Sequence, residues 1–170
     1  MNNRRAETPG VVAPPPLVYA IPLAAGLVVQ HYRPQPVLPS LLSRVVGIGL
    51  VVVGFVAFAA VAAFRRAGTS PNPWKPVSAL VVSGPYRWTR NPMYLGLTLW
   101  YLGIAAWVNT VWPLLALPLT LLSMHYGVIR REEAYLERQF GEEYRRYKAA
   151  VSVALTGYDA PAHRLTRACC

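Results

Sequence analysis

Charged side chains are scarce in this chain and make up only 14% of its 170 residues. A soluble domain carries about 25% charged residues, so the composition argues against a soluble protein and favours one that lies in lipid. The charges are also unbalanced, with 17 Lys and Arg against 7 Asp and Glu. An excess of cations is typical of nucleic-acid-binding proteins, but it is also typical of membrane proteins, in which the cations keep to one side of the bilayer.

Residues suited to metal binding or nucleophilic catalysis are few. The two cysteines, Cys169 and Cys170, are adjacent at the end of the chain, where they suit neither a structural disulfide nor a zinc site. The three histidines form no metal-ligand spacing with one another, with cysteine or with a carboxylate. No Ser-His-Asp arrangement and no glycine-rich phosphate loop is visible. We therefore expect no metal site, and we interpret the cysteines as free thiols in a disordered C-terminal end.

Long apolar runs, by contrast, are abundant. A helix of about 20 apolar residues crosses a hydrocarbon core of about 30 Å, and residues 41–64 form such a run. Residues 11–30 form a weaker one, which four prolines interrupt. Residues 93–108 and 111–129 form a pair of runs joined by the uncharged sequence NTVWP, which is typical of a helical hairpin. The sequence thus predicts an all-α integral membrane protein with about four transmembrane helices.

The cations lie almost entirely on one side of these predicted spans. They precede the first span, separate the second from the third and follow the fourth, and only Arg33 and Arg44 lie elsewhere. This is the positive-inside pattern of multi-pass membrane proteins. It predicts that both termini are cytoplasmic, and it explains the basic charge without nucleic acid. The basic surface would also attract anionic membrane lipids.

The predicted cytoplasmic segments differ in character. Residues 65–76 contain three prolines and a glycine and form no regular helix. The following sequence, VSALVVSG, is apolar and β-branched, and we expect it to be an extended re-entrant or interface segment. Non-helical backbone at membrane depth is tolerated only where it is buried in protein or lines a cavity, so this segment points to a cavity. After the fourth span, residues 130–155 are typical of a charged amphipathic helix, interrupted at Gly141 and lying under the membrane. We expect residues 1–10 to be disordered, residues 11–155 to form one membrane domain and residues 156–170 to form a flexible tail.

Two clusters could carry chemistry, and the predicted topology brings them to the same face. In the first, GPYRWTRNPMYLG, Pro92 starts a helix whose free N–H groups can bind a carboxylate, while Tyr86 and Tyr94 can stack on a flat ring or meet a cation. The second contains Arg130, Arg131, Glu132 and Glu133, where a carboxylate can take up an ammonium group or ribose hydroxyls. Together they suit a ligand with a carboxylate, an ammonium group, a sugar and a flat base. Aromatic anchors at the membrane surface with a solvated charge run are the alternative, and residue chemistry alone favours neither.

The two clusters resemble a known family. GPYRWTRNPMYLG followed by REEAYLERQFGEEYRRYK is similar to the paired motifs of the isoprenylcysteine carboxyl methyltransferase and phospholipid methyltransferase superfamily of membrane enzymes. The family pattern is Gly-x-Tyr, Arg-His-Pro-x-Tyr-x-Gly, Glu-Glu-x-x-Leu and Phe-Gly-x-x-Tyr-x-x-Tyr. The resemblance covers about half of the chain, residues 78–151, with both blocks in order and a hairpin between them.

This resemblance implies S-adenosyl-L-methionine as the cofactor, bound on the cytosolic side. By position, it assigns the following residues to cofactor binding: Ser78, Ala79, Leu80, Val81, Tyr86, Asn91, Pro92, Met93, Tyr94 and Glu132. The sequence departs from the family pattern at Asn91, where the family has histidine, and at Val128, where it has an arginine associated with the prenylcysteine carboxylate. Arg130 or Arg131 would take over that arginine's role in orienting an anionic acceptor. The family's Arg-aromatic ending is also replaced, by VSVALTG.

We therefore expect a multi-pass membrane methyltransferase that takes a lipophilic acceptor from the bilayer, either an isoprenylcysteine-type carboxylate or a lipid headgroup. A non-catalytic membrane scaffold that retains the fold is the alternative favoured by the altered acceptor residues. Membrane sterol reductases share a related helical core and use NADPH, but this chain is short for that class and lacks an obvious cluster for the extra phosphate.

Overall fold

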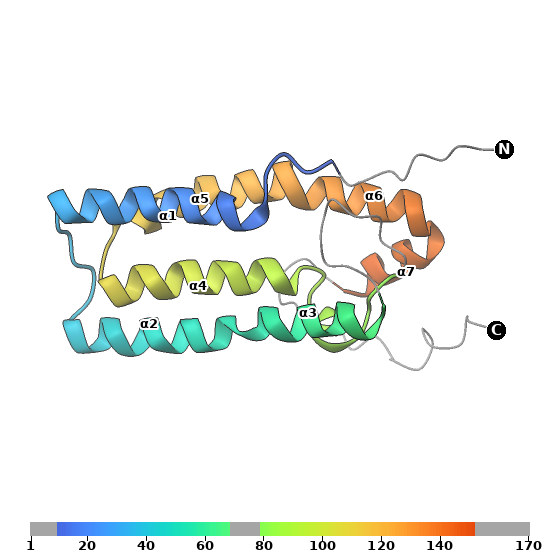
Figure 1. Ribbon diagram of the computed structural model, residues 1–170, viewed down its shortest axis with the longest axis horizontal. Helices are drawn as coiled ribbons and strands as arrows, with labels where there is room; N and C mark the ends of the chain where they lie inside the picture. Colours follow the sequence, from blue (N-terminus) through green and yellow to red (C-terminus); the bar gives the residue numbers. More distant parts are fainter. Residues whose placement is uncertain (1–9, 69–78, 152–170) are drawn as a thin grey trace.

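The computed structural model describes residues 10–68 and 79–151, and the regular secondary structure in these two ranges is all helical (Figure 1). This confirms the all-α prediction for the described residues. Ser78, Cys169, Cys170 and nearly all of the two predicted disordered ends lie outside them. The helices are α1 (Pro15–Tyr32), α2 (Ser40–Gly54), α3 (Val56–Arg66), η1 (Gly84–Arg87), α4 (Pro92–Val108), α5 (Trp112–Met124), η2 (His125–Ile129), α6 (Arg130–Phe140) and α7 (Glu142–Ala150).

The helices form an elongated antiparallel bundle (Figure 1). α2 continues into α3 after a break at Phe55, and α5 continues into α6 through the π-helical turn η2. α2 packs against α4 and α1 packs against α5, while α4 also contacts α1 and α3. In chain order, α1, the α2–α3 pair, α4 and α5 correspond to the apolar runs predicted from the sequence.

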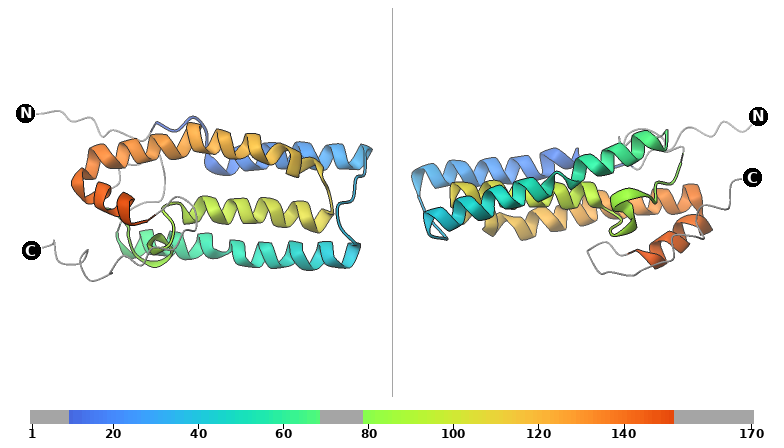
Figure 2. Two further views of the ribbon diagram at one scale, coloured as in Figure 1. Left: turned by 180° about the vertical axis from the view of Figure 1, so that it is seen from behind. Right: turned by 90° about the horizontal axis from the view of Figure 1, so that it is seen from below.

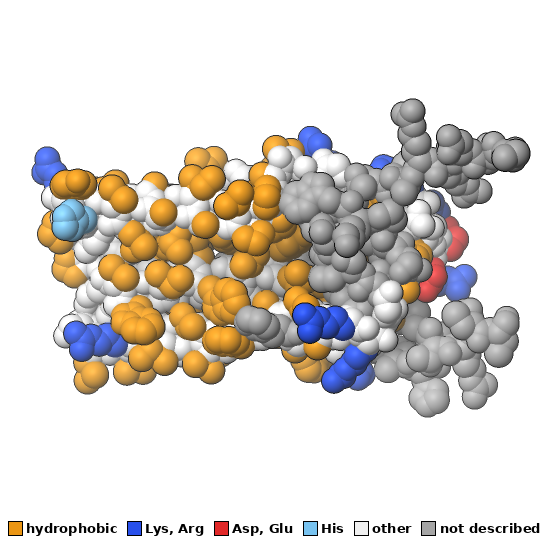
Figure 3. Space-filling view, in the orientation of Figure 1, with side chains coloured by type: hydrophobic (Ala, Val, Ile, Leu, Met, Phe, Trp, Pro, Cys, Tyr) orange, Lys and Arg blue, Asp and Glu red, His pale blue; other side chains and the backbone are white. Residues whose placement is uncertain are grey.

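Two helical runs in the described ranges, Ser40–Ala63 and Trp112–Phe140, are long and apolar enough to cross a membrane. The helix Pro92–Val108 is apolar but shorter. In the second run the apolar residues end at Ile129, and α6 beyond it is strongly charged. On the face seen in Figure 3, hydrophobic side chains cover the bundle, and charged side chains lie toward its two ends. This distribution suits a bundle surrounded by lipid.

Glycines bring α2 and α4 into close contact. Gly47 faces Gly103, and Gly54 faces Gly96, with the same spacing on each helix. A Cβ atom at Gly47 would lie 2.6 Å from the Trp107 nitrogen and 2.8 Å from the Gly103 oxygen. The two backbones are therefore too close for any side chain at these positions, which is also the way in which membrane helices pack through small residues.

At the C-terminal end of α4, Asn109 connects two loops. Its backbone is left-handed, with φ 57°, which lets the chain turn sharply after α4. Its side-chain oxygen accepts hydrogen bonds from the Val37 and Leu38 nitrogens, at 2.9 and 3.0 Å, and its side-chain nitrogen donates to the Leu38 oxygen at 2.7 Å. Trp112 Nε1 donates to the Arg33 oxygen at 2.7 Å. The predicted tight turn is thus anchored to the loop between α1 and α2.

The C-terminal helical segment differs in part from the prediction. The interruption at Gly141 is confirmed, since α6 ends at Phe140 and α7 begins at Glu142. Gly141 adopts φ 55° and ψ −123°, a conformation available essentially to glycine alone. However, α6 is not a separate helix, because η2 makes it a continuation of α5, and α7 then folds back beside it (Figure 2). The expected place of this segment under the membrane stays a prediction.

Candidate functional site

The segment that leads into the site, residues 79–83, is extended and packs on both α3 and α7. Val81 packs with Ala60 and Ala63 of α3, whereas Leu80 and Val82 pack against the cluster of α7 that contains Tyr144 and Tyr147. Side chains that alternate in this way are characteristic of extended backbone. In the described part of VSALVVSG, Val81 is buried, Ala79, Leu80 and Val82 are half-buried, and Ser83 and Gly84 are exposed. Non-helical backbone is thus confirmed for residues 79–83, and the re-entrant or interface position stays a prediction.

Tyr86, in the short helix η1, is held in place by α7. Its side chain is 7% exposed, and its carbonyl oxygen accepts a hydrogen bond from the Tyr147 hydroxyl at 2.8 Å. Burial raises the pKa of the Tyr86 hydroxyl above its ordinary value, and the nearby Tyr147 and Glu132 raise it further. Tyr86 is therefore a neutral aromatic group within electrostatic reach of Glu132.

The start of α4 turns the chain toward the site. Asn91 precedes the helix and donates its backbone N–H to Thr89 Oγ1 at 3.3 Å, and Pro92 is buried at the first helical position, where its missing N–H costs no hydrogen bond. Met93 packs on the cluster that contains Val81. The side-chain nitrogen of Asn91 is buried and has no hydrogen-bond acceptor among the described residues. A buried donor without an acceptor is unfavourable, so this nitrogen is suited to bind a ligand.

Tyr94 and Glu132 bring the two sequence clusters together. The Tyr94 hydroxyl lies 2.7 Å from both carboxylate oxygens of Glu132, across 38 residues of sequence. Tyr94 projects from the first turn of α4, and Glu132 projects from the first turn of α6. The structure therefore brings the two clusters together, as predicted, through the contact between Tyr94 and Glu132.

Glu132 is a half-buried residue whose carboxylate no cation neutralises within the described part of the chain. None of the ion pairs there includes it. It lies beyond Ile129, where the apolar part of its helix ends. Burial raises the pKa of Glu132 to about 7, and the hydrogen bond from Tyr94 only partly opposes this rise. A cation placed beside this carboxylate would favour its ionised form, so the position is suited to bind a positively charged ligand.

The structure does not bring Arg130 and Arg131 to this pair. Both are exposed; the Arg130 guanidinium lies 5.6 Å from the centre of the Tyr126 ring, and Arg131 Nη1 donates to the Gly10 oxygen at 2.9 Å. Val128 is 1% exposed and packs in the core. The suggested role of the two arginines with an anionic acceptor stays a prediction.

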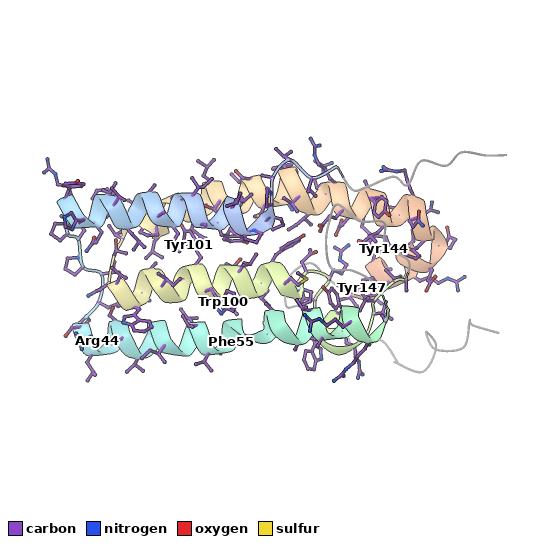
Figure 4. The ribbon with its side chains drawn as sticks, viewed as in Figure 1. Arg44, Phe55, Trp100, Tyr101, Tyr144 and Tyr147 are labelled. Atoms are coloured by element: carbon purple, nitrogen blue, oxygen red, sulfur yellow. The ribbon has the colours of Figure 1, made fainter. Side chains whose placement is uncertain are left out.

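Sequence reasoning missed an ionic contact beside the site. Arg90 Nη1 lies 2.9 Å from Glu133 Oε1, and the two side chains are only 11% and 16% exposed. Lys148 Nζ of α7 lies 3.5 Å from the other oxygen of Glu133. Tyr144 and Tyr147, on the same helix, lie at the end of the bundle opposite Arg44 (Figure 4). The sequence did contain a signal for this contact, because Arg90 lies four residues before Tyr94 and Glu133 directly follows Glu132.

The chain is similar to a known protein family and to three proteins. The profile of the phospholipid methyltransferase family matches residues 42–143, which include Tyr86, Tyr94 and Glu132. An uncharacterized protein of Haemophilus influenzae is 42% identical over 59 residues, which are 35% of this chain and 94% of that protein.

Two yeast enzymes are also similar to this chain. The protein-S-isoprenylcysteine O-methyltransferases of Schizosaccharomyces pombe and Saccharomyces cerevisiae are 35% and 36% identical over 72 and 76 residues. These matches cover 42% and 45% of this chain but only 30% and 32% of the two enzymes. No solved structure matches.

Proposed function

Since the chain belongs to the phospholipid methyltransferase family, we propose that it is a multi-pass membrane enzyme that transfers a methyl group from S-adenosyl-L-methionine to a lipophilic acceptor. The acceptor is an isoprenylcysteine-type carboxylate or a lipid headgroup. The observation that carries the proposal is the contact between Tyr94 and Glu132, which joins the two family motifs around a half-buried carboxylate.

The residues present fit the cofactor. Glu132 offers a half-buried carboxylate without a cationic partner among the described side chains, and Asn91 offers a buried N–H donor without an acceptor there. Tyr86 and Tyr94 add aromatic faces, which attract cations. Bound S-adenosyl-L-methionine would supply a methyl group activated by its sulfonium: a lone pair of the acceptor would bond to the methyl carbon while the methyl–sulfur bond breaks, with S-adenosylhomocysteine as the leaving group. The protein's task is then to align the reacting groups and exclude water.

A membrane arrangement with four spans completes the proposal. α1, the α2–α3 run, α4 and α5 would cross the bilayer, and both termini would be cytoplasmic. The concentration of cations at the end that carries α6 and α7 supports this orientation. The candidate cofactor site would then lie at the cytoplasmic surface, where a polar cofactor arrives from water and a lipophilic acceptor arrives from the bilayer. Arg130 and Arg131, exposed at the same end, would orient an anionic acceptor.

The proposal is tested by incubating the purified protein, in a bilayer of its own lipids, with S-adenosyl-L-methionine that carries a radiolabelled methyl group. We expect label in the lipid extract with the wild type and none with Glu132→Ala, and saturable cofactor binding by calorimetry only with the wild type. Absence of saturable binding by the wild-type protein would rule the proposal out.

A non-catalytic scaffold is the second candidate, because one acceptor position of the family is lost. Val128 is buried in an apolar cluster with Val11 and Met124 and offers no charge to an acceptor carboxylate. A scaffold would transfer no methyl group, whether or not it binds the cofactor, so it would leave every lipid fraction unlabelled. Label in any identified lipid or lipidated peptide would exclude it.

A further inference from the structure

Glu132 and Glu133 are consecutive on α6 but contact different parts of the segment that leads into α4. Glu132 contacts Tyr94, and Glu133 forms an ion pair with Arg90. Arg90 lies four residues before Tyr94 in the sequence. The first turn of α6 is therefore attached to the start of α4 at two points. Because α6 continues α5 through η2, the two contacts act on the side chains of one helical turn, and together they restrict the direction in which the Glu132 carboxylate points.

The second contact continues into α7. Lys148 Nζ lies 3.5 Å from Glu133 and 3.7 Å from Glu137. Burial raises the pKa of the Tyr144 hydroxyl, Glu133 raises it further and Arg90 opposes this rise, so Tyr144 lies close to both members of the pair. Arg90, Glu133 and Lys148 thus connect the α4 entry, α6 and α7.

The burial of Arg90 and Glu133 indicates a role beyond stability. A mostly buried ion pair contributes little net stability compared with apolar side chains of the same size, but it penalises strongly any arrangement that separates its partners. Such a pair is suited to fix one geometry. Functional side chains depend on this kind of support, since small displacements of a binding group lower its affinity for a ligand.

We propose that Arg90, Glu133 and Lys148 are positioning residues, which hold the Glu132 carboxylate against Tyr94 in the geometry that binds the cofactor. The inference rests on the proposed function, because it concerns the affinity of the same site. It also replaces the earlier interpretation of Arg90, whose charge alone suggested only membrane topology.

A double-mutant cycle with Tyr94→Phe tests this role. Calorimetry with S-adenosyl-L-methionine should show that Glu133→Gln weakens binding about tenfold, or about 1.4 kcal/mol, in the wild-type background. In the Tyr94→Phe background, where the contact to be positioned is missing, the same change should weaken binding less than twofold. Residues that act as one unit give such non-additive effects, whereas independent residues give additive ones.

Three further variants complete the test. Lys148→Met removes one partner of Glu133 from a half-exposed position and should show the same dependence on Tyr94 with a smaller loss, even where Glu133→Gln fails to fold. The exchanged pair Arg90→Glu with Glu133→Arg should recover most of the affinity. Glu142→Gln is the matched control, because it removes an exposed ion pair with Arg145 at the same corner and should change affinity less than twofold.

The outcomes separate this inference from the proposed function. Equal losses with and without the Tyr94 hydroxyl, in variants of wild-type melting temperature, would overturn the positioning role alone. A wild-type protein that does not bind S-adenosyl-L-methionine would overturn the proposed function and this inference with it.

Discussion

At the scale of single residues, the protonation of Glu132 sets how a cation binds. Because its pKa is raised to about 7 in the free protein, Glu132 is mostly neutral below pH 7 and mostly ionised above it. The ionised carboxylate attracts the cationic cofactor and the neutral one does not. Affinity should therefore fall about tenfold per pH unit as the pH drops below 7, and binding near pH 7 should take place with release of a proton.

This pH dependence can be measured by calorimetry in buffers of different ionisation enthalpy. Glu132→Gln removes the titrating group, so it should bind weakly at every pH and release no proton. The same raised pKa means that ionisation of Glu132 opposes folding, so the free protein should lose stability as the pH rises from about 4.5 through 7. A pH-independent affinity in the wild type would contradict the assignment of Glu132.

Tyr94 supplies the other half of the central contact. Tyr94→Phe keeps the aromatic face and removes the hydroxyl that lies 2.7 Å from the Glu132 carboxylate. A hydrogen bond to a charged group contributes about 1.5–3 kcal/mol, so we expect cofactor affinity to fall between about tenfold and a hundredfold. Tyr126→Phe is the matched control, because Tyr126 is 57% exposed and contacts Arg130; an equal loss there would show that the effect is not specific to the site.

At the scale of helices, the contact between α2 and α4 depends on glycine. Gly47→Ala places a Cβ atom 2.6 Å from the Trp107 nitrogen, and overpacking of this kind costs about 1–3 kcal/mol. Gly49→Ala, two residues away on the same helix, meets no atom within 4 Å and should be neutral or slightly stabilising, because alanine favours helix. Melting temperatures of the two variants in detergent should therefore differ clearly, with Gly47→Ala the lower.

Asn109 stabilises the turn between α4 and α5 through its backbone conformation and its side-chain hydrogen bonds, and two substitutions separate these contributions. Asn109→Gly keeps the left-handed conformation but removes three hydrogen bonds to residues 37 and 38, and it should lower stability by about 1–3 kcal/mol. Asn109→Asp keeps the two accepted hydrogen bonds but places a carboxylate oxygen where the side-chain nitrogen donates to the Leu38 oxygen at 2.7 Å, so its melting temperature should also lie below that of the wild type. A glycine variant as stable as the wild type would show that backbone conformation alone decides this turn.

These elements show what the sequence could and could not predict. Apolar runs fixed the order of the helices, and Gly141 marked the end of α6, because both signals are local. The pairing of Gly47 with Gly103 depends on the register of two distant helices, which no local pattern carries. Arg90 looked like every other cation of its segment, since only the packing of α6 against the start of α4 decides that it is buried. The Tyr94–Glu132 contact was predictable only because the order of the spans placed both motifs at one end.

At the scale of the whole molecule, the distribution of cations determines the orientation that we propose. All cations except Arg33 and Arg44 lie before the first predicted span, between the second and third, or after the fourth, and in the predicted topology these three segments are on the same side of the membrane. Moving cations across a bilayer is unfavourable. Cys169 and Cys170 are the only cysteines in the chain, so a membrane-impermeant thiol reagent reports on the C-terminus of the unmodified protein. It should label permeabilised cells and leave intact cells unlabelled.

The opposite end of the bundle provides the complementary measurement. Gln35 is exposed in the loop between α1 and α2, the loop that Asn109 and Trp112 hold against the start of α5. Gln35→Cys, made in a chain whose two native cysteines are changed to serine, should be labelled in intact cells. The reverse pattern for both probes would place the Tyr94–Glu132 site outside the cell. A cytoplasmic supply of S-adenosyl-L-methionine could not reach it there, so the proposed activity requires that the C-terminal cysteines be protected and Gln35→Cys be exposed.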